Sequence, residues 1–267
     1  MTNLRIAAAS FIIALVGALS ASATTITLAA GSGYIFRDGD LAVAIDALTA
    51  YGTTEAMQEL MQTAEFPYDL DVILVTHSDF DHFDAALVAA NMQTQTSSLL
   101  VGPTDVVTAV RDLLPEVQES RFLVATRQTG QPIVTDWDEL QLIPFSFPHP
   151  PNGSRPNLGY VFTIGTITLF HPGDLDYNQA EQLFESYELG TRAIDIAFIP
   201  AFMFMDTGLF DTIGNLNARC LIPTHTLPLH LARDCQRTIL HFASVLCFQQ
   251  LLQEIEYTTE IACEAAT

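Results

Sequence analysis

The sequence predicts an α/β fold in which strands and helices form packed layers. Short strand-like runs alternate with helical patterns along the chain, which is typical of that class. The run Asp71–Thr76 is almost continuously apolar, as in a strand that is buried on both faces of its sheet. Hydrophobic residues make up 49% of the 267 residues, a content that indicates a globular protein with a full core and argues against disorder.

The first 23 residues have the three parts of a secretory signal. Met1–Arg5 carries one positive charge, Ile6–Leu19 is uncharged, and Ala21-Ser22-Ala23 supplies the small residues of a cleavage site. The uncharged run is shorter than the roughly 20 residues that cross a membrane, so a spanning anchor is the weaker alternative. We therefore expect an exported protein, periplasmic or secreted, which begins near Thr24 and keeps no stable membrane anchor. Residues 24–267 are enough for one large domain.

The first half of this domain predicts four strands and three helices. Glycine-rich turns separate the first three strands, and the helices show apolar residues at helical spacing. The strands are expected at Thr24–Ala29, Tyr34–Arg37, Leu41–Ile45 and Asp71–Thr76, and the helices at Thr54–Ala64, Asp84–Asn91 and Thr104–Leu114.

The second half predicts five more strands and a largely helical C-terminal segment. The strands are expected at Leu140–Phe147, Gly159–Ile164, Thr166–Phe170, Ala193–Ile199 and Arg219–Pro223. Asn178 and Glu181 resemble a capping box for a helix that runs to about Leu189. Further helices are expected at Leu209–Leu216 and, in one or two pieces, at Leu229–Ile255.

The charge composition argues against a nucleic-acid binder. The formal net charge is −21, and all ten basic residues are Arg because the chain contains no Lys. Such a surface repels polyanions and lacks the basic stripe that nucleic-acid binding needs. We therefore expect a small-molecule substrate and no nucleic-acid partner, and the sequence leaves the oligomeric state open.

All four cysteines lie in the last fifth of the chain, at Cys220, Cys235, Cys247 and Cys263. None belongs to a CxxC pair, so a structural zinc knuckle is not indicated. An even number of cysteines permits disulfides in an oxidising compartment, and three complete pairings remain open. Any such bridge would hold the C-terminal region together.

The densest group of chemically active residues directly follows the apolar run Asp71–Thr76. The segment His77–Asp84 (HSDFDHFD) contains two His and three Asp in eight residues. Burying these groups unpaired would be prohibitive, so a core segment is excluded and the remaining alternative is a solvated acidic loop. Loops at strand ends display functional groups, and His and Asp are ligands of divalent metals. We therefore favour a metal site.

This segment resembles the signature of the metallo-β-lactamase superfamily, HxHxDH after a buried strand, although it reads HxDxDH here. Other motifs match in the same order: Asp46 in AIDAL, His149 in FPHPP, Asp174 in FHPGDLD and His225 in IPTHTLP. The resemblance spans roughly Gly31 to Leu227. Within the superfamily, the stretches from Gly159-Tyr160 to Asp174 and from Ile222 to His225 are most similar to compact lactonase-like members, such as the L-ascorbate-6-phosphate lactonase group.

The resemblance implies an αββα four-layer sandwich with a site for two metal ions at one edge, between the two sheets. It assigns His77, Asp79 and His149 to the first metal, Asp81, His82 and His225 to the second, and Asp174 to a position that bridges both. A hydroxide between the metals would be the nucleophile, since metal binding lowers the pKa of water to about 7. Asp81 would orient this hydroxide and later pass on its proton, which makes it the candidate catalytic residue.

Asp79 is the one departure from the family pattern, which has His at this position. Two Zn²⁺ ions are the first expectation for a set of imidazole and carboxylate ligands. Because a carboxylate is harder than an imidazole, Asp79 makes Mn²⁺ or Fe²⁺ an alternative at the first metal. It also leaves open whether one or two ions are bound.

The other polar and apolar candidates are weaker. We expect His171 to support the ligands, and His230 and His241 to be structural. The segment 201–206 (AFMFMD) is either core packing or an apolar pocket wall. Arg155 is either an idle surface residue or a group that grips a substrate anion.

Three functions remain in competition. The leading hypothesis is hydrolysis of a small ester, lactone or amide by a metal-bound hydroxide. The second is hydrolysis of a phosphodiester or phosphate ester in the same fold, against which the scarcity of basic residues near the motifs counts. The third is a non-catalytic metal-binding protein, against which the otherwise complete ligand set counts. A fold alone does not choose among them.

Overall fold

The computed structural model describes residues 23–125, 140–150, 155–259 and 263. The secretory signal predicted for residues 1–23 therefore lies outside the described residues, except for Ala23. Among the described helices, none has both the length and the hydropathy needed to cross a membrane.

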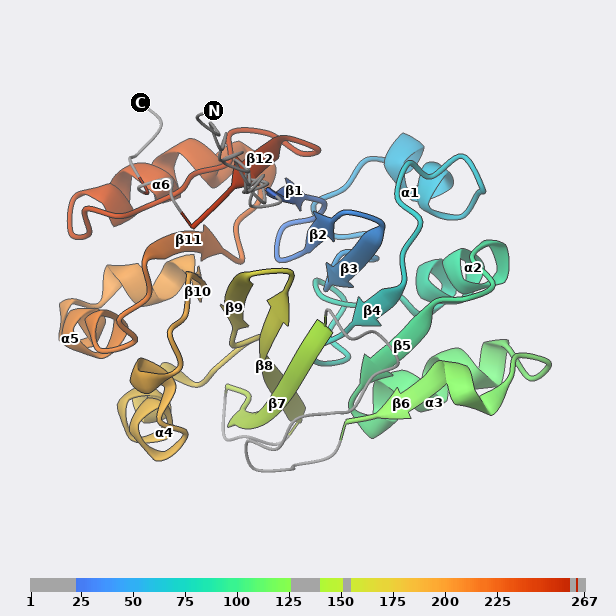
Figure 1. Cartoon of the computed structure of the whole chain (residues 1–267), viewed down its shortest axis with the longest axis horizontal. Helices are drawn as coiled ribbons and strands as arrows, with labels where there is room; N and C mark the ends of the chain where they lie inside the picture. The colour runs from blue at the N-terminus through green and yellow to red at the C-terminus, as the bar shows by residue number, and fades with distance from the viewer. Residues whose placement is uncertain (1–22, 126–139, 151–154, 260–262, 264–267) are drawn as a thin grey trace, which may run out of the picture.

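Two β-sheets form the centre of the molecule (Figure 1). The seven-stranded sheet has the order β12-β1-β2-β3-β4-β5-β6, and the five-stranded sheet has the order β11-β10-β9-β8-β7. The first contains β1 Thr24–Leu28, β2 Tyr34–Asp38, β3 Leu41–Ile45, β4 Val72–Leu74, β5 Leu99–Gly102, β6 Phe122–Val124 and β12 Glu254–Tyr257. The second contains β7 Leu140–Pro148, β8 Pro156–Ile164, β9 Ile167–His171, β10 Ile196–Pro200 and β11 Cys220–Thr224.

Helices cover the outer face of each sheet (Figure 1). On the side of the seven-stranded sheet lie α1 Glu55–Met61, α2 Ala85–Thr94 and α3 Thr104–Leu113. On the side of the five-stranded sheet lie α4 Ala180–Ser186, α5 Phe210–Gly214 and α6 Leu231–Ile239. The layers are therefore helix, sheet, sheet, helix, which confirms the expected αββα four-layer sandwich.

The alternation of side chains along each strand produces this layering, as β3 illustrates. Leu41, Val43 and Ile45 join the apolar cluster between the two sheets. Ala42 and Ala44, which point the other way, join the cluster beneath α1, α2 and α3. Small side chains under the helices and larger ones between the sheets let both layers pack closely, and each fully buried Val, Leu or Ile contributes about 1.5–3 kcal/mol.

Strand direction brings several carboxyl ends to one edge of the sandwich. β3, β4, β5 and β6 are parallel in the first sheet, and β9, β10 and β11 are parallel in the second. β7 and β9 are both antiparallel to β8 and therefore run in the same direction as each other. The loops that follow β3, β4, β7, β9 and β11 carry the candidate site residues.

The helix predicted at Leu229–Ile255 is wrong beyond Ile239, where α6 ends. The apolar residues Val245–Phe248 are buried in an extended segment that runs along β11, and Leu246 N–H donates to the carbonyl of Leu221. Past this segment the chain forms β12, which pairs with β1. Tertiary pairing with two strands thus outweighs the local helical pattern.

The capping box expected at Asn178 and Glu181 is also wrong. Asp176 is the capping residue, because its Oδ1 accepts a hydrogen bond from the backbone N–H of Asn178 at 3.2 Å. A single turn of 3₁₀ helix at Tyr177–Gln179 follows, and α4 begins only at Ala180.

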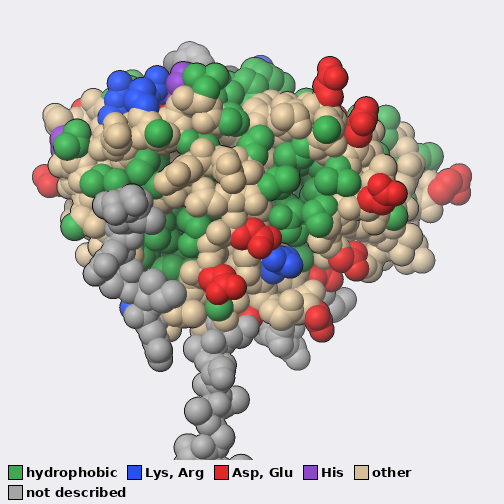
Figure 2. Space-filling view, turned by 90° about the horizontal axis from the view of Figure 1, so that it is seen from above, with side chains coloured by type: hydrophobic (Ala, Val, Ile, Leu, Met, Phe, Trp, Pro, Cys, Tyr) green, Lys and Arg blue, Asp and Glu red, His purple; other side chains and the backbone are tan. Residues whose placement is uncertain are grey.

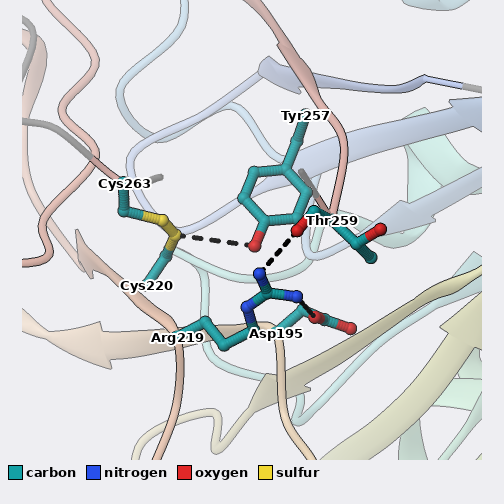
Figure 3. The surroundings of a disulfide bond; sticks show 6 residues. All are labelled: Asp195, Arg219, Cys220, Tyr257, Thr259 and Cys263. Atoms are coloured by element: carbon teal, nitrogen blue, oxygen red, sulfur yellow. Dashed lines mark hydrogen bonds and ion pairs between the residues drawn. A yellow bond between two sulfur atoms is a disulfide. The ribbon is translucent and has the colours of Figure 1, made fainter. Parts of the chain in front are cut away.

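Two disulfides, Cys220–Cys263 and Cys235–Cys247, hold the C-terminal region, and no described cysteine is free. Figure 3 shows the first of them beside Tyr257, whose hydroxyl donates to Cys220 Sγ at 3.7 Å. On the same side, Arg219 donates to the carbonyl of Thr259 and forms an ion pair with Asp195 (Figure 3). The bridge therefore fixes Cys263 to β11, the strand that leads to His225.

Acidic side chains are spread over much of the face drawn in Figure 2, whereas most of the basic side chains gather in one small patch near its upper left edge. This distribution agrees with the net charge of −21. It leaves no basic stripe on this face that could follow a polyanion.

Candidate metal centre

All seven predicted ligands come together at the edge where the carboxyl ends of the strands meet. They come from four separate loops, each of which directly follows a strand. The positions are His77, Asp79, Asp81 and His82 after β4, His149 after β7, Asp174 after β9, and His225 after β11.

The first group contains His77, Asp79 and His149, with one possible ligand atom from each within 4.8 Å of the others. Asp79 Oδ2 lies 3.9 Å from His77 Nε2 and 3.3 Å from His149 Nε2. Asp79 therefore points into the site, in the position where the family pattern has His.

The second group contains Asp81, His82, Asp174 and His225, again within 4.8 Å of one another. His225 Nε2 lies 3.1 Å from Asp81 Oδ2 and 3.3 Å from Asp174 Oδ2. His82 Nε2 lies 3.2 Å from Asp174 Oδ1. His225 has a positive φ of 58°, and a non-glycine residue with this backbone geometry is uncommon and typical of functional sites.

Asp174 connects the two groups. Besides its contacts in the second group, its Oδ2 lies 4.0 Å from His77 Nε2 and 3.8 Å from His149 Nε2. One carboxylate thus faces three His Nε2 atoms with Oδ2 and a fourth with Oδ1. This is the placement that a bridging ligand needs.

The backbone around Asp174 is held by Asn157. Asn157 Oδ1 accepts from Asp174 N–H at 3.1 Å, and Asn157 Nδ2 donates to the carbonyl of Pro172 at 3.1 Å. Gly173 between them has φ +61°, and a Cβ there would clash with Asn157 Oδ1 and lie 2.8 Å from Thr76 Cβ. A glycine is therefore required for Asp174 to reach the centre.

Buried Asp46 orients His82. Asp46 Oδ2 lies 2.8 Å from His82 Nδ1, and Asp46 also accepts from the backbone N–H of Thr76 at 2.8 Å and from its hydroxyl at 2.7 Å. The carboxylate thus holds the proton of His82 on Nδ1 and turns the Nε2 lone pair toward the site. Asp46 has φ +47°, a second uncommon backbone geometry at this edge.

Thr76 orients His77 in the same way. Its Oγ1 lies 2.9 Å from His77 Nδ1, and because this hydroxyl already donates to Asp46, it accepts from His77. His77 Nε2 therefore also presents a lone pair to the site. Asp46 lies in one of the family motifs, whereas Thr76 and Asn157 do not, and their roles were not predicted. A polar residue directly before His77, at the end of a buried strand, is the signal that indicates Thr76.

The charges of the site shift the pKa values of its histidines in opposite directions. Burial lowers the pKa of His82, but the carboxylates of Asp174 and Asp46 outweigh burial and raise it to about 10. The same competition, with Asp174 and Asp81 as partners, raises the pKa of His225 to about 9. Burial, together with the neighbouring His82, lowers the pKa of His77 to about 3. The second group therefore attracts positive charge strongly.

The residues fit divalent metal ions. The Nε2 atoms of His77, His82, His149 and His225 are buried and make no hydrogen bond within the described part of the chain. Four buried nitrogen atoms without a hydrogen bond, which converge on carboxylates, would be costly unless a ligand satisfied them. Imidazole nitrogen and carboxylate oxygen are the donors that Zn²⁺, Mn²⁺ and Fe²⁺ accept.

The weaker candidates separate clearly. His171 is buried, with Nε2 3.2 Å from the carbonyl of Ser32, and it accepts at Nδ1 from Gly173 N–H, so it supports the loop that carries Asp174. His241 is exposed and lies against the ring of Phe210, and His230 belongs to neither group. Arg155, which is 59% exposed, forms an ion pair with Asp79 and is therefore not idle.

The segment 201–206 combines the two roles considered for it. Ala201, Met203 and Phe204 are buried in the core beside the five-stranded sheet. Phe202 and Met205 face outward, and the Phe202 ring lies 5.6 Å from that of His225. Core packing thus anchors a short 3₁₀ helix that presents apolar side chains next to the site.

Comparisons with known proteins agree with this geometry. The family model described as "Beta-lactamase superfamily domain" matches residues 42–232. None of the curated proteins matches the chain. Among solved structures, a metallo hydrolase from the archaeon Ignicoccus hospitalis is 15% identical, with a TM-score of 0.63 and coverage of 90% of this chain and 100% of that chain.

Two further structures are similar at the same level. An isothiocyanate hydrolase from Delia radicum gut bacteria is 12% identical, with a TM-score of 0.59 and coverage of 87% of this chain and 99% of that one. A diphosphatase from the PhnP family is 14% identical, with a TM-score of 0.54 and coverage of 88% and 97%. At these identities the likeness shows the fold and not the substrate.

The matched range of the family model contains all seven candidate ligands. Family membership and the two His and Asp groups together support a metal-dependent hydrolase. The lactonase-like branch stays a prediction, whereas the superfamily is confirmed: this chain belongs to the β-lactamase superfamily and has the metallo-β-lactamase fold.

Proposed function

We propose that the protein is an exported hydrolase that cleaves a small ester, lactone or amide with the help of two divalent metal ions. The observation that carries this proposal is the pair of His and Asp groups that share Asp174, with four buried Nε2 atoms directed at their carboxylates. His77, Asp79 and His149 would hold one ion, Asp81, His82 and His225 the other, and Asp174 both.

When bound, the metal ions would polarise the carbonyl oxygen of the substrate and make water more acidic. The protein supplies orientation and proton transfer. Asp46 and Thr76 fix the rings of His82 and His77, so the reacting groups meet a rigid site. Asp81 Oδ2, 3.1 Å from His225 Nε2, would accept the proton of the attacking water and deliver it to the leaving group.

Zn²⁺ is the proposed metal. At the first position the alternative is Mn²⁺ or Fe²⁺, because the carboxylate of Asp79 is a harder ligand than the imidazole of the family pattern. Burial raises the pKa of Asp81, but the His225 and His82 side chains outweigh burial and lower it. Asp81 is therefore a carboxylate at neutral pH, ready to accept a proton.

Export is supported by the signal in the sequence and by the two disulfides at Cys220–Cys263 and Cys235–Cys247. Disulfides persist in oxidising compartments and are rare in the cytosol of most organisms. We therefore propose a periplasmic or secreted location, with a mature chain that begins near Thr24. N-terminal sequencing of secreted material tests this, and an intact Met1 would contradict it.

Arg155 favours a second candidate function, hydrolysis of a phosphodiester or phosphate ester. Its guanidinium reaches Asp79 at the first group, where it could also contact a phosphate oxygen. We rank this function second, because among the described residues Arg155 is the one Arg that forms an ion pair with a candidate ligand.

Metal analysis of the purified mature chain is the first experiment, followed by a panel of chromogenic ester, lactone, amide, β-lactam and phosphodiester substrates. We expect two equivalents of metal and activity on an ester, lactone or amide. Activity confined to phosphodiesters would replace the proposed substrate class with the second candidate. Bound metal without any turnover would leave a non-catalytic metal-binding protein.

A further inference from the structure

A cavity of about 440 Å³ opens beside the second group of ligands. Its lining residues come from the loop after β9 and from the segment after β10: Tyr177, Phe202, Met205, Asp206, Thr207 and Leu209. The volume falls within the range of roughly 300–1,000 Å³ that is usual for small-molecule sites.

Ring contacts join this cavity to the metal centre. The Phe202 ring meets the His225 ring edge-on, with centroids 5.6 Å apart and planes at 79°. The centroid of the Tyr177 ring lies 6.3 Å from that of Phe202, and Tyr177 follows Asp174 by only three residues. A molecule whose reacting bond lies at His225 and Asp174 can therefore extend directly into the cavity.

Four of the six side chains that line the cavity are aromatic or apolar, and two of these four are well exposed to solvent. Met205 is 59% exposed and Tyr177 is 40% exposed, although large apolar side chains gain free energy when they are covered. The backbone that carries Met205 is anchored, since the buried Met203 and Phe204 belong to the same 3₁₀ helix, Ala201–Met205. Met205 is thus held in a preformed part of the wall, where a bound molecule would cover it.

The charges around the cavity restrict what that partner can be. Asp206 is the one charged residue in the lining, and its Oδ1 accepts from Gly208 N–H at 2.9 Å. The nearby Arg237 touches Met205 Sδ at 3.8 Å and also faces Asp234 at 3.8 Å. With a carboxylate in the wall and no cation in it, an anionic group would be repelled.

We infer that this cavity binds an uncharged apolar substituent of the substrate, aromatic or branched aliphatic, while the scissile bond lies at the metal centre. The inference rests on the proposed hydrolase function and adds the chemical class of the substrate. Tyr177 and Phe202 can contact such a substituent with their rings, and Met205, which is flexible and polarisable, adapts to its shape. Phe202 and Met205 are therefore specificity-determining residues.

Matched substrates test the inference on the mature, metal-loaded enzyme. Benzyl acetate carries a ring on the alcohol side of the scissile bond, methyl phenylacetate carries one on the acyl side, and methyl acetate carries none. Lactones or amides with and without a phenyl substituent make the same comparison for those substrate classes. We expect the wild type to prefer a ring-bearing substrate. In Phe202→Ala the ratio of kcat/KM between ring-bearing and ringless substrates should fall about tenfold, and in Met205→Gln severalfold.

Leu240→Ala is the matched control, because Leu240 is 78% exposed and lies outside the cavity at the end of α6. Its ratio should stay within twofold of that of the wild type. An unchanged ratio in both Phe202→Ala and Met205→Gln, or a wild-type preference for the ringless substrate, would overturn the inference.

A binding measurement separates this inference from the proposed function. Saturation-transfer NMR with benzyl alcohol needs no turnover and can be run on the metal-free mature chain. We expect saturation transfer to the ring protons, reduced by at least half in Phe202→Ala and in Met205→Gln but not in Leu240→Ala. If the wild type hydrolyses no ester, lactone or amide, the proposed function fails, and this measurement alone decides whether the cavity binds apolar groups. Equal transfer in all four proteins would show that it does not.

Discussion

Asp46 and His82 form a buried pair in which Asp46 Oδ2 lies 2.8 Å from His82 Nδ1, and neither side chain is more than 1% exposed. The pair links β3, which ends next to Asp46, with the loop that follows β4. Because the carboxylate fixes the ring from behind, the direction of His82 Nε2 depends on a residue that is not itself a candidate ligand.

Replacing this carboxylate should weaken the metal site without removing a ligand. We expect Asp46→Asn to lower metal affinity and kcat about 10–100-fold, the usual effect of losing such a support, because an amide no longer holds the His82 proton on Nδ1 by charge. Metal affinity measured by competition with a chelator tests this. The exposed Asp112→Asn on α3 is the control, and equal affinity in the two variants would contradict the role given to Asp46.

Removal of a direct ligand should have a larger effect. His82→Ala and His225→Ala should abolish hydrolysis and lower the amount of bound metal, because no neighbouring group can replace the missing nitrogen. His241→Ala, at an exposed position outside both groups, should change neither. Metal analysis and activity assays on the three variants test whether His82 and His225 are ligands. Full activity in His225→Ala would remove this residue from the second group.

Asp79→His should restore the commoner, His-rich ligand set. An imidazole is neutral and softer than a carboxylate, so the variant should prefer zinc over manganese more strongly than the parent does. The site would also lose one negative charge, which should move the pH–rate profile to lower pH. Asp79→Ala should instead lose the first metal and keep the second.

Dialysis against equal zinc and manganese, followed by metal analysis, tests the parent and both Asp79 variants. If all three carry the same metals in the same amounts, Asp79 is not a ligand. The ion pair with Arg155 would then be its main role.

Metal uptake should release protons. In the metal-free protein at pH 7, His82 and His225 are protonated because their pKa values are about 10 and about 9, and each must lose its proton before Nε2 can bind a metal. We expect the release of about two protons per chain at pH 7, and an affinity that rises as pH rises toward 9. Calorimetric titration in two buffers of different ionisation enthalpy measures this number, and a value near zero would contradict the assignment.

The same shifts set the pH dependence of the metal-free fold. Since both pKa values lie above the ordinary value of 6.5, the stability that these two histidines contribute is complete below pH 6.5 and is lost as pH rises through 9 and 10. Urea unfolding of metal-free protein between pH 6.5 and 10 should show this loss. His82→Ala and His225→Ala should each show less of it.

The disulfides should contribute measurably to stability. The Cys235–Cys247 bridge joins residues 12 positions apart in the sequence, and the Cys220–Cys263 bridge joins residues 43 positions apart. In the chain-entropy picture these loops correspond to about 3 and about 4 kcal/mol. Cys235→Ser/Cys247→Ser and Cys220→Ser/Cys263→Ser should lower the free energy of unfolding in urea by amounts of this order. A reducing agent should destabilise the parent, and it should have a smaller effect on each double variant, which retains one bridge.

The sequence predicted the αββα fold and the loops that carry the candidate site, but not every element around them. The His77–Asp84 segment and His149, Asp174 and His225 stand directly after strands, in the order of the family motifs, and the resemblance to the family therefore predicted that they meet at one edge. The roles of Thr76 and Asn157 could not be predicted, because a lone Thr or Asn belongs to no spacing pattern. Their hydrogen bonds depend on loops that meet only in the folded chain.

The strands that the sequence missed are short or lie in ambiguous runs. β5 has four residues and β6 has three, too few for either periodicity to show. The long helix predicted through Ile255 failed because Val245–Phe248 pairs along β11 and Cys247 is bridged back to α6 at Cys235. Long-range pairing of this kind is absent from any local window.

The pairing of β1 with β12 affects when the protein can complete its fold during synthesis. Thr24 lies opposite Tyr257, so the seven-stranded sheet can gain this edge strand only after residue 257 has left the ribosome. Contacts between residues so distant in the sequence form slowly. Late completion of the sheet would keep the polypeptide unfolded for longer, and this would suit the export proposed above if it uses a channel that takes unfolded chains.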